Sequence, residues 1–114
     1  MNTDFVERVQ KRGAEILTIK GTSSVFSAAN AAKDHMHTWF LGEKSGLLHS
    51  MGVITDGTTY GIPKDLCFSF PVRFRGNFNY EVETKYKMDS FDQEKLAITT
   101  KELMEERAEA FSAN

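Results

Sequence analysis

The sequence has one cysteine, Cys67, and two prolines among its 114 residues. A single cysteine closes no intramolecular disulfide and builds no multi-thiolate metal site, so we expect a reducing, cytoplasmic compartment. No uninterrupted apolar run approaches the roughly 18 residues of a membrane span, and the N-terminus lacks a basic segment followed by an apolar one. We therefore expect a soluble, unexported protein with no membrane partner.

An excess of charge of one sign is also lacking. Fourteen Lys and Arg residues stand against sixteen Asp and Glu residues, for a formal net charge of −2 and a pI of about 5.9. Nucleic acids and anionic membranes bind a concentrated basic face, so neither is an expected partner. The glycines at 42, 46, 52, 57 and 61 form neither a G-x-G-x-x-G nor a Walker pattern. The chain alone is therefore expected to bind no nucleotide.

What is present is the composition of one soluble globular domain, with 40% hydrophobic and 26% charged residues. Two amphipathic helices are predicted first, over residues 4–20 and from residues 22–24 to about Phe40. The hydroxyls at 22–24 can accept hydrogen bonds from the first free N–H groups of the second helix. The middle of that helix is lined by small side chains, which allow another helix to approach closely within the domain or between subunits. These are Ala28, Ala29, Ala31 and Ala32.

In the middle of the chain the apolar period changes from helical spacing toward two. Residues 47–55 are predicted to form a strand, and residues 67–74 a half-buried strand with phenylalanines on one face. Pro71 in the second strand predicts a missing backbone donor at a sheet edge or bulge. Residues 77–83 complete an antiparallel hairpin after a turn at 75–77.

A long helix is predicted at the C-terminus, starting at an S-x-x-Q capping box formed by Ser90 and Gln93. Its predicted buried face consists of Leu96, Thr100, Leu103, Met104, Ala108 and Phe111. The order of elements indicates an α+β fold with two N-terminal helices, a small antiparallel sheet of about three strands and a long C-terminal helix. One domain over residues 1–114 is expected.

Four side chains could be mistaken for reactive groups. His35 and His37 are two residues apart on a helix, so they point in different directions, and no third ligand is placed to complete a metal site. His49 would act as a general base only if a pocket and an orienting carboxylate met at it. Cys67 would need a nearby histidine or helix N-terminus to become a nucleophile. We predict structural roles for all four, and no catalytic or metal-ligating residue.

Several strings of residues carry a family resemblance. They are S-M-G-V-I-T-D-G at 50–57, Y-G-I-P-K-D-L at 60–66, S-F-P-V at 69–72, V-Q-K-R-G-A at 9–14 and S-S-V-F-S-A-A at 23–29. In their order along the chain, they resemble the C-terminal part of malate dehydrogenases of the cytosolic type, within the lactate/malate dehydrogenase family. The resemblance extends over nearly the whole chain.

The resemblance implies that the chain is the substrate domain of an NAD-dependent oxidoreductase acting on malate and oxaloacetate, without the N-terminal Rossmann domain. In the family the NAD fingerprint, the substrate-binding arginines and the catalytic His and Asp lie upstream of the matching segment. None of them can be assigned here, so the isolated chain is expected to be inactive and to bind no NAD. Ser23 and Ser24 match the pocket wall near the substrate and the nicotinamide, although an N-cap role for Ser23 accounts equally well for its position.

The resemblance also implies a homodimer. Ala28, Ala29 and Ala32 match a helix near the subunit interface of the family. Without the dinucleotide-binding domain, an apolar face including Phe5, Val25, Phe26 and Trp39 is expected to be exposed and to favour self-association. The alternative function is a non-catalytic interaction or dimerisation module that keeps the fold.

Overall fold

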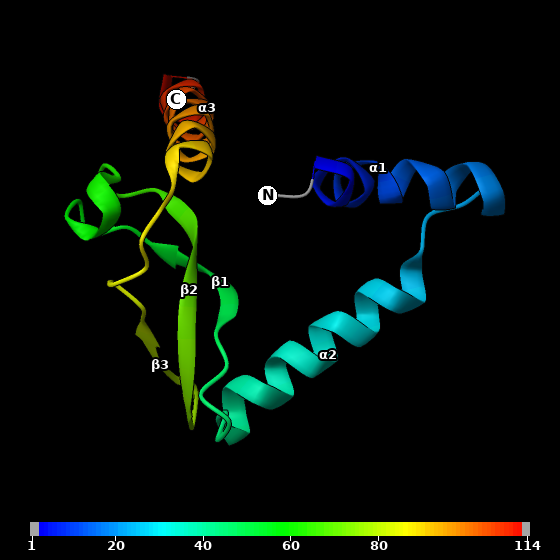
Figure 1. Ribbon diagram of the computed structural model, residues 1–114, viewed down its shortest axis with the longest axis horizontal. Coiled ribbons are helices and arrows are strands. Elements are labelled where there is room, and N and C mark those ends of the chain that lie inside the picture. The colour runs from blue at the N-terminus through cyan, green and yellow to red at the C-terminus, as the bar shows by residue number, and fades with distance from the viewer. Residues whose placement is uncertain (1–2, 113–114) are drawn as a thin grey trace. The chain divides into compact units, whose positions relative to one another are not determined.

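The computed structural model describes residues 3–112 and divides the chain into two compact units, residues 1–38 and 39–114. The first unit contains α1 (Thr3–Lys20) and most of α2 (Val25–Leu41). The second contains the last turn of α2, a three-stranded sheet and α3 (Ser90–Ser112), as labelled in Figure 1. Three helices and an antiparallel sheet confirm the predicted α+β class. No helix among the described residues is long and apolar enough to cross a bilayer.

The helices of the first unit bury none of their described side chains. α1 ends at Gly21, which has φ +71° and donates its N–H to Leu17 O at 2.9 Å, the αL ending that glycine favours. Phe5 is 65% exposed and Phe26 86% exposed, so the expected apolar face lies open. The prediction that Trp39 belongs to this face is wrong, because its side chain packs against the core of the second unit.

The sheet has the order β1 (His49–Ile54), β2 (Cys67–Gly76), β3 (Asn79–Val82), with all pairs antiparallel. Between β1 and β2 lies a short 3-10 segment, η1 (Thr59–Gly61). The alternation predicted for β2 is confirmed, since one face of the strand is buried and the other is mostly exposed. The buried hydrophobic members of β2 are Phe68, Phe70, Val72 and Phe74, which with Met51, Ile62 and Leu66 form the core.

Pro71 does not lie at a sheet edge, because β2 is the central strand. It lies instead where β3 ends. Glu83, the residue after β3, donates its N–H to Pro71 O at 2.8 Å. In an antiparallel pair of this kind, the N–H of residue 71 would donate the second bond, to Glu83 O. The hydroxyl of Tyr60 donates to Glu83 O in place of the N–H that proline lacks.

The turn between β2 and β3 is formed by Asn77 and Phe78 rather than by residues 75–77 as predicted, because Gly76 still belongs to β2. Its N–H groups bind the end of α2, with Asn77 N–H donating to Phe40 O at 2.7 Å. In return, Trp39 Nε1 donates to Phe78 O at 2.7 Å, and the two rings meet edge to face with centroids 5.2 Å apart. The turn therefore caps the last turn of α2.

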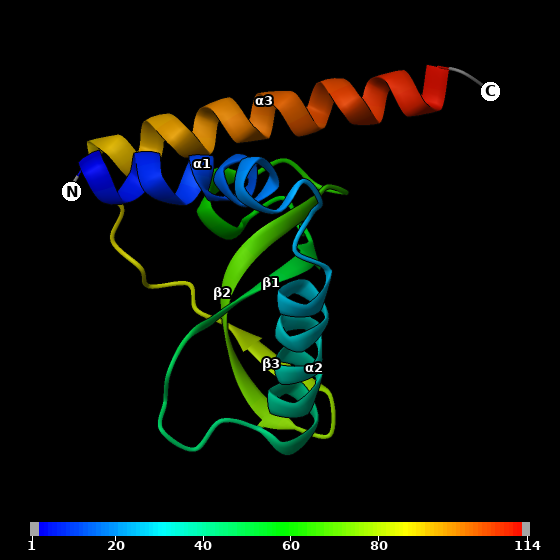
Figure 2. The ribbon, with the colours of Figure 1, turned by 90° about the vertical axis from the view of Figure 1, so that its right-hand side faces the viewer.

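Helix α3 crosses the end of the sheet where β1 ends and β2 begins (Figure 2). Its capping box lies one residue earlier than predicted, because Asp89 Oδ1 accepts the N–H of Asp92 at 2.8 Å and the Asp92 carboxylate accepts the N–H of Asp89. Aspartate is as good an N-cap as serine. The predicted buried face is correct only for its first part. Leu96, Thr100 and Leu103 are half-buried, whereas Met104, Ala108 and Phe111 are exposed, since they follow the part of α3 that covers the core.

Candidate functional site

The N-terminus of α2 is the site that sequence reasoning singled out. Ser24 O accepts the N–H of Ala28 at 3.4 Å, which makes Ser24 the N-cap residue. The hydroxyl of Ser24 is hydrogen-bonded to the hydroxyl of Ser27, which in turn donates to Ser24 O at 3.2 Å. Ser23 is exposed and Ser24 half-buried. The cap is thus a pair of serines, and Ser27 was missed although its i,i+3 spacing from Ser24 is visible in the sequence.

Such a helix start can bind an anion but cannot transfer a proton. Free N–H groups and the positive end of the helix dipole favour a carboxylate or phosphate. A serine hydroxyl next to no base remains a hydrogen-bonding group. The helix start at Ser23 and Ser24 can therefore hold an anion but supplies no acid–base group.

The small-residue face of α2 is open. Ala28, Ala29 and Ala32 are exposed, and α2 has no buried residue. Asp34, on the opposite side of the helix, accepts a bond from Asn30 Nδ2 at 3.0 Å. The pKa of the Asp34 carboxyl is lowered, most strongly by the bond from the Lys33 ammonium and less by the bond from Asn30. One side of α2 is therefore flat and apolar and the other is charged.

The four side chains set aside in the sequence lie outside the first turn of α2 or on other elements. His35 and His37 lie further along α2, and within residues 3–112 no three His, Cys, Asp or Glu side chains gather as a metal site would require. Cys67 is exposed at the start of β2. His49 does meet a carboxylate, since Glu43 Oε2 lies 3.5 Å from its Nε2.

That cluster is not a nucleophile and base. Ser45 Oγ donates to Glu43 Oε1 at 2.6 Å, so the serine is bonded to the carboxylate and not to the imidazole of His49. The bonds from Ser45 lower the pKa of the Glu43 carboxyl. Sequence reasoning named the missing requirement, an orienting carboxylate, but had no means to pair residues 43 and 49 across a loop.

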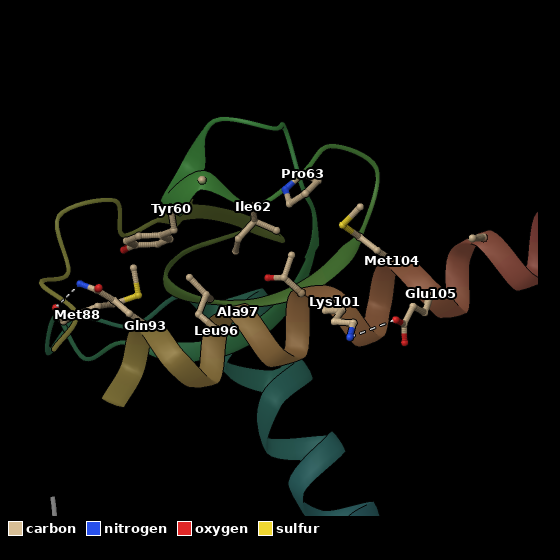
Figure 3. A pocket seen from close by; sticks show the side chains of 13 residues that line it. Tyr60, Ile62, Pro63, Met88, Gln93, Leu96, Ala97, Lys101, Met104 and Glu105 are labelled. Atoms are coloured by element: carbon tan, nitrogen blue, oxygen red, sulfur yellow. Dashed lines mark hydrogen bonds and ion pairs between the residues drawn. The ribbon is translucent and has the colours of Figure 1, made fainter. Parts of the chain in front are cut away.

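The second unit also contains a groove of about 850 Å³ between the η1 segment and α3 (Figure 3). Tyr60, Ile62 and Pro63 form one wall, and the α3 side chains form the other. Its charged members, Lys101 and Glu105, are paired with each other at 3.8 Å on the helix surface. The groove is apolar, and the geometry gives it no acid–base chemistry.

Comparison with known proteins decides the family. A family model described as the lactate/malate dehydrogenase alpha/beta C-terminal domain matches residues 1–114. The chain belongs to the lactate/malate dehydrogenase family. It is 47% identical over 109 residues to cytoplasmic malate dehydrogenase of Caenorhabditis elegans, covering 96% of this chain and 32% of that protein. Over 108 residues it is 41% identical to cytoplasmic malate dehydrogenase of Felis catus, covering 95% of this chain and 32% of that one.

Solved structures of the family share the fold. Malate dehydrogenase from Naegleria fowleri superimposes with a TM-score of 0.85 at 39% identity, over 93% of this chain and 32% of that one. Lactate dehydrogenase from Trichomonas vaginalis in complex with NADH and oxamate superimposes with a TM-score of 0.87 at 32% identity, over 96% of this chain and 34% of that one. The chain thus spans about a third of the length of the relatives that it matches. In this family the fold described above is that of the C-terminal domain.

Proposed function

We propose that this chain serves as the substrate domain of an NAD-dependent malate dehydrogenase, which oxidises malate to oxaloacetate. The observation that carries the proposal is the 47% identity to a cytoplasmic malate dehydrogenase over 96% of the chain. Names of relatives also suggest a cytoplasmic location. The dinucleotide-binding domain would be a separate part, joined to or associated with residues 1–114.

In this proposal the chain's own contribution is binding. The start of α2, with Ser23 and Ser24, would form the pocket wall beside the substrate and the nicotinamide. Its free N–H groups suit a carboxylate of malate. NAD, when bound, supplies the hydride acceptor. The glycines of this chain fit no dinucleotide cradle, so its main binding surface would be on the other domain and the isolated chain would be inactive.

A domain exchange tests the function. The matching third of the Caenorhabditis elegans enzyme is replaced by residues 1–114, and reduction of NAD is followed with malate and, separately, with lactate. We expect malate-dependent activity from the hybrid and none from the chain alone. A folded hybrid that is inactive with both substrates would refute the proposal and favour the non-catalytic module. Activity with lactate alone would mean that the substrate is lactate and not malate.

Within an active hybrid, Ser24→Asp separates a pocket wall from a helix cap. Aspartate caps a helix as well as serine does and adds a favourable negative charge at its N-terminus, so α2 should stay formed. A dicarboxylate substrate would be repelled, and we expect KM for malate to rise by about tenfold, the equivalent of roughly 1.4 kcal/mol. Thr22→Asp, two residues earlier and outside the helix, is the control and should change KM less. An unchanged KM in Ser24→Asp would leave this residue as a cap only.

We also propose that the alanine face of α2 contributes to a homodimer. Ala28, Ala29 and Ala32 lie on an open side of the helix, where a second helix could approach closely. Light scattering on the chain should give twice the monomer mass. Ala29→Glu should shift the mass toward that of the monomer, whereas Asn30→Glu, on the opposite side of α2, should leave the dimer intact. A monomer in the unmodified chain would contradict the proposal.

A further inference from the structure

Two connecting segments of the second unit are attached to the central strand β2. The entry segment, residues 42–48, joins α2 to β1, and the exit segment, residues 83–89, joins β3 to α3. In the entry segment, Glu43 N–H donates to Phe74 O at 3.0 Å, and in the exit segment, Glu83 N–H donates to Pro71 O at 2.8 Å. Because β1 and β3 lie on opposite sides of β2, the two attachments lie on opposite sides as well.

One side chain of β2, that of Arg73, contacts both segments. Its Nη1 donates to Gly46 O in the entry segment, and its Nη2 donates to Glu83 Oε2 at 2.8 Å in the exit segment. A guanidinium is planar and holds several donors in a fixed fork, so the position of one partner constrains the position of the other. The side chains of Arg73 and Glu83 are only 33% and 21% exposed, which limits the screening of their ion pair by solvent.

The carboxylate of Glu83 extends this contact further into the exit segment. Its Oε1 accepts the N–H of Lys85 at 2.9 Å, while its Oε2 accepts the bond from Arg73. The bond from Arg73, followed by that from Lys85, lowers the pKa of the Glu83 carboxyl. A continuous series of hydrogen bonds therefore runs from Gly46 O through the Arg73 guanidinium and the Glu83 carboxylate to the Lys85 amide.

We propose that Arg73 couples the entry and exit segments, so that loosening either segment makes the other open more often. When the entry segment moves away, the guanidinium loses Gly46 O and regains rotational freedom, which weakens its bond to Glu83. The same reasoning applies in the opposite direction, because a coupling free energy is reciprocal. Arg75 contacts Glu81 on β3, in a pair whose two side chains are more than half exposed, and has no such role.

Amide hydrogen exchange on the chain, at a single pH, tests the coupling from the exit side. Glu83→Gln keeps an acceptor for Lys85 but removes the charge that holds Arg73, and we expect the Glu43 amide in the other segment to exchange roughly two- to fivefold faster. The Thr55 amide, bonded to Leu66 O at 2.8 Å, should not change. Glu81→Gln is the matched control and should leave the Glu43 rate as it is. An unchanged Glu43 rate in Glu83→Gln, an equal rise in Glu81→Gln, or a parallel rise at Thr55 would overturn the proposal.

A second pair of variants tests the coupling from the entry side. Gly46 has φ +76° and its added Cβ would have only ordinary contact with Arg73, so Gly46→Ala strains the entry segment through its backbone. We expect the Lys85 amide in the exit segment to exchange about two- to fivefold faster. In an Arg73→Met background, which removes both bonds and keeps an aliphatic side chain, Gly46→Ala should no longer affect Lys85. A Lys85 rate that Gly46→Ala leaves unchanged, or raises equally with and without Arg73, would show that the segments open independently.

Discussion

Replacing Tyr60 by phenylalanine should destabilise the second unit through one hydrogen bond. The Tyr60 hydroxyl supplies the donor for Glu83 O that Pro71 cannot supply, and without it this half-buried carbonyl loses its bond. The net value of such a bond is about 1 kcal/mol. Tyr60 has φ +53°, but phenylalanine would adopt the same backbone conformation at the same cost, so the comparison isolates the hydroxyl. We expect the free energy of unfolding to fall by about 1 kcal/mol.

The explanation can be tested by restoring the missing donor. Pro71→Val returns an N–H to β2 in register with Glu83. When Tyr60→Phe is made in this background, Glu83 O still has the N–H of residue 71 as a donor. The cost of Tyr60→Phe should then drop, giving a coupling of about 0.5 to 1 kcal/mol in the double-mutant cycle. The effect of proline on the unfolded chain cancels in the cycle.

Urea unfolding followed by the fluorescence of Trp39, the single tryptophan, gives all four free energies. Tyr86→Phe removes an exposed hydroxyl and is the matched control, which we expect to change stability by less than about 0.5 kcal/mol. An equal cost of Tyr60→Phe in both backgrounds would refute the view that the hydroxyl replaces the Pro71 N–H.

Three further outcomes follow from the structure. Gly76→Ala should destabilise the second unit by about 1 to 3 kcal/mol in urea unfolding, because φ is +87° and the new Cβ would lie 3.3 Å from Leu41 O; a neutral change would mean that the turn relaxes freely. Trp39→Phe should lower the free energy of unfolding by about 1 kcal/mol or more, because the bond to Phe78 O is lost. Unfolding of this variant is followed by circular dichroism. The hydrogen bonds that Asp56 accepts from the backbone N–H groups of Thr59 and Thr58 lower the pKa of its carboxyl. The carboxylate therefore stabilises the folded protein above the ordinary aspartate pKa, and this stabilisation is lost as the pH falls. Asp56→Asn should therefore make acid unfolding less steep, and an unchanged acid transition would contradict this.

The sequence predicts the elements of this fold well where alternation or helical spacing is strong. The buried face of β2 is correct because four large apolar residues alternate without interruption from Phe68 to Phe74. Pro71 was misjudged because a side chain distant in sequence, that of Tyr60, supplies the missing donor, and no local pattern shows this. The capping box of α3 was displaced by one residue because Asp89 and Ser90 are equally good caps and only their partners distinguish them.

The same limit applies more strongly to the candidate site. Periodicity predicts α1 and α2 but not what covers them, and side chains such as Phe26 remain exposed in the described structure. The serine cap of α2 was predicted from the hydroxyl residues at 22–24, and its pocket-wall role from the family resemblance. The i,i+3 spacing of Ser27 from Ser24 was visible in the sequence but overlooked, whereas the Glu43–His49 contact depends on three-dimensional placement.

The chemistry available at the start of α2 sets what a test of this site should measure. N–H groups and a serine hydroxyl can hold a carboxylate in both the ground state and the transition state, and they offer no group that accepts a proton. Binding of equal strength in both states changes KM and leaves kcat unchanged. If Ser24 lines the pocket of the proposed malate dehydrogenase, Ser24→Asp in the hybrid should therefore raise KM while kcat stays within about twofold. A fall in kcat with a constant KM would instead mean that Ser24 acts in the transition state alone, which this helix start does not explain.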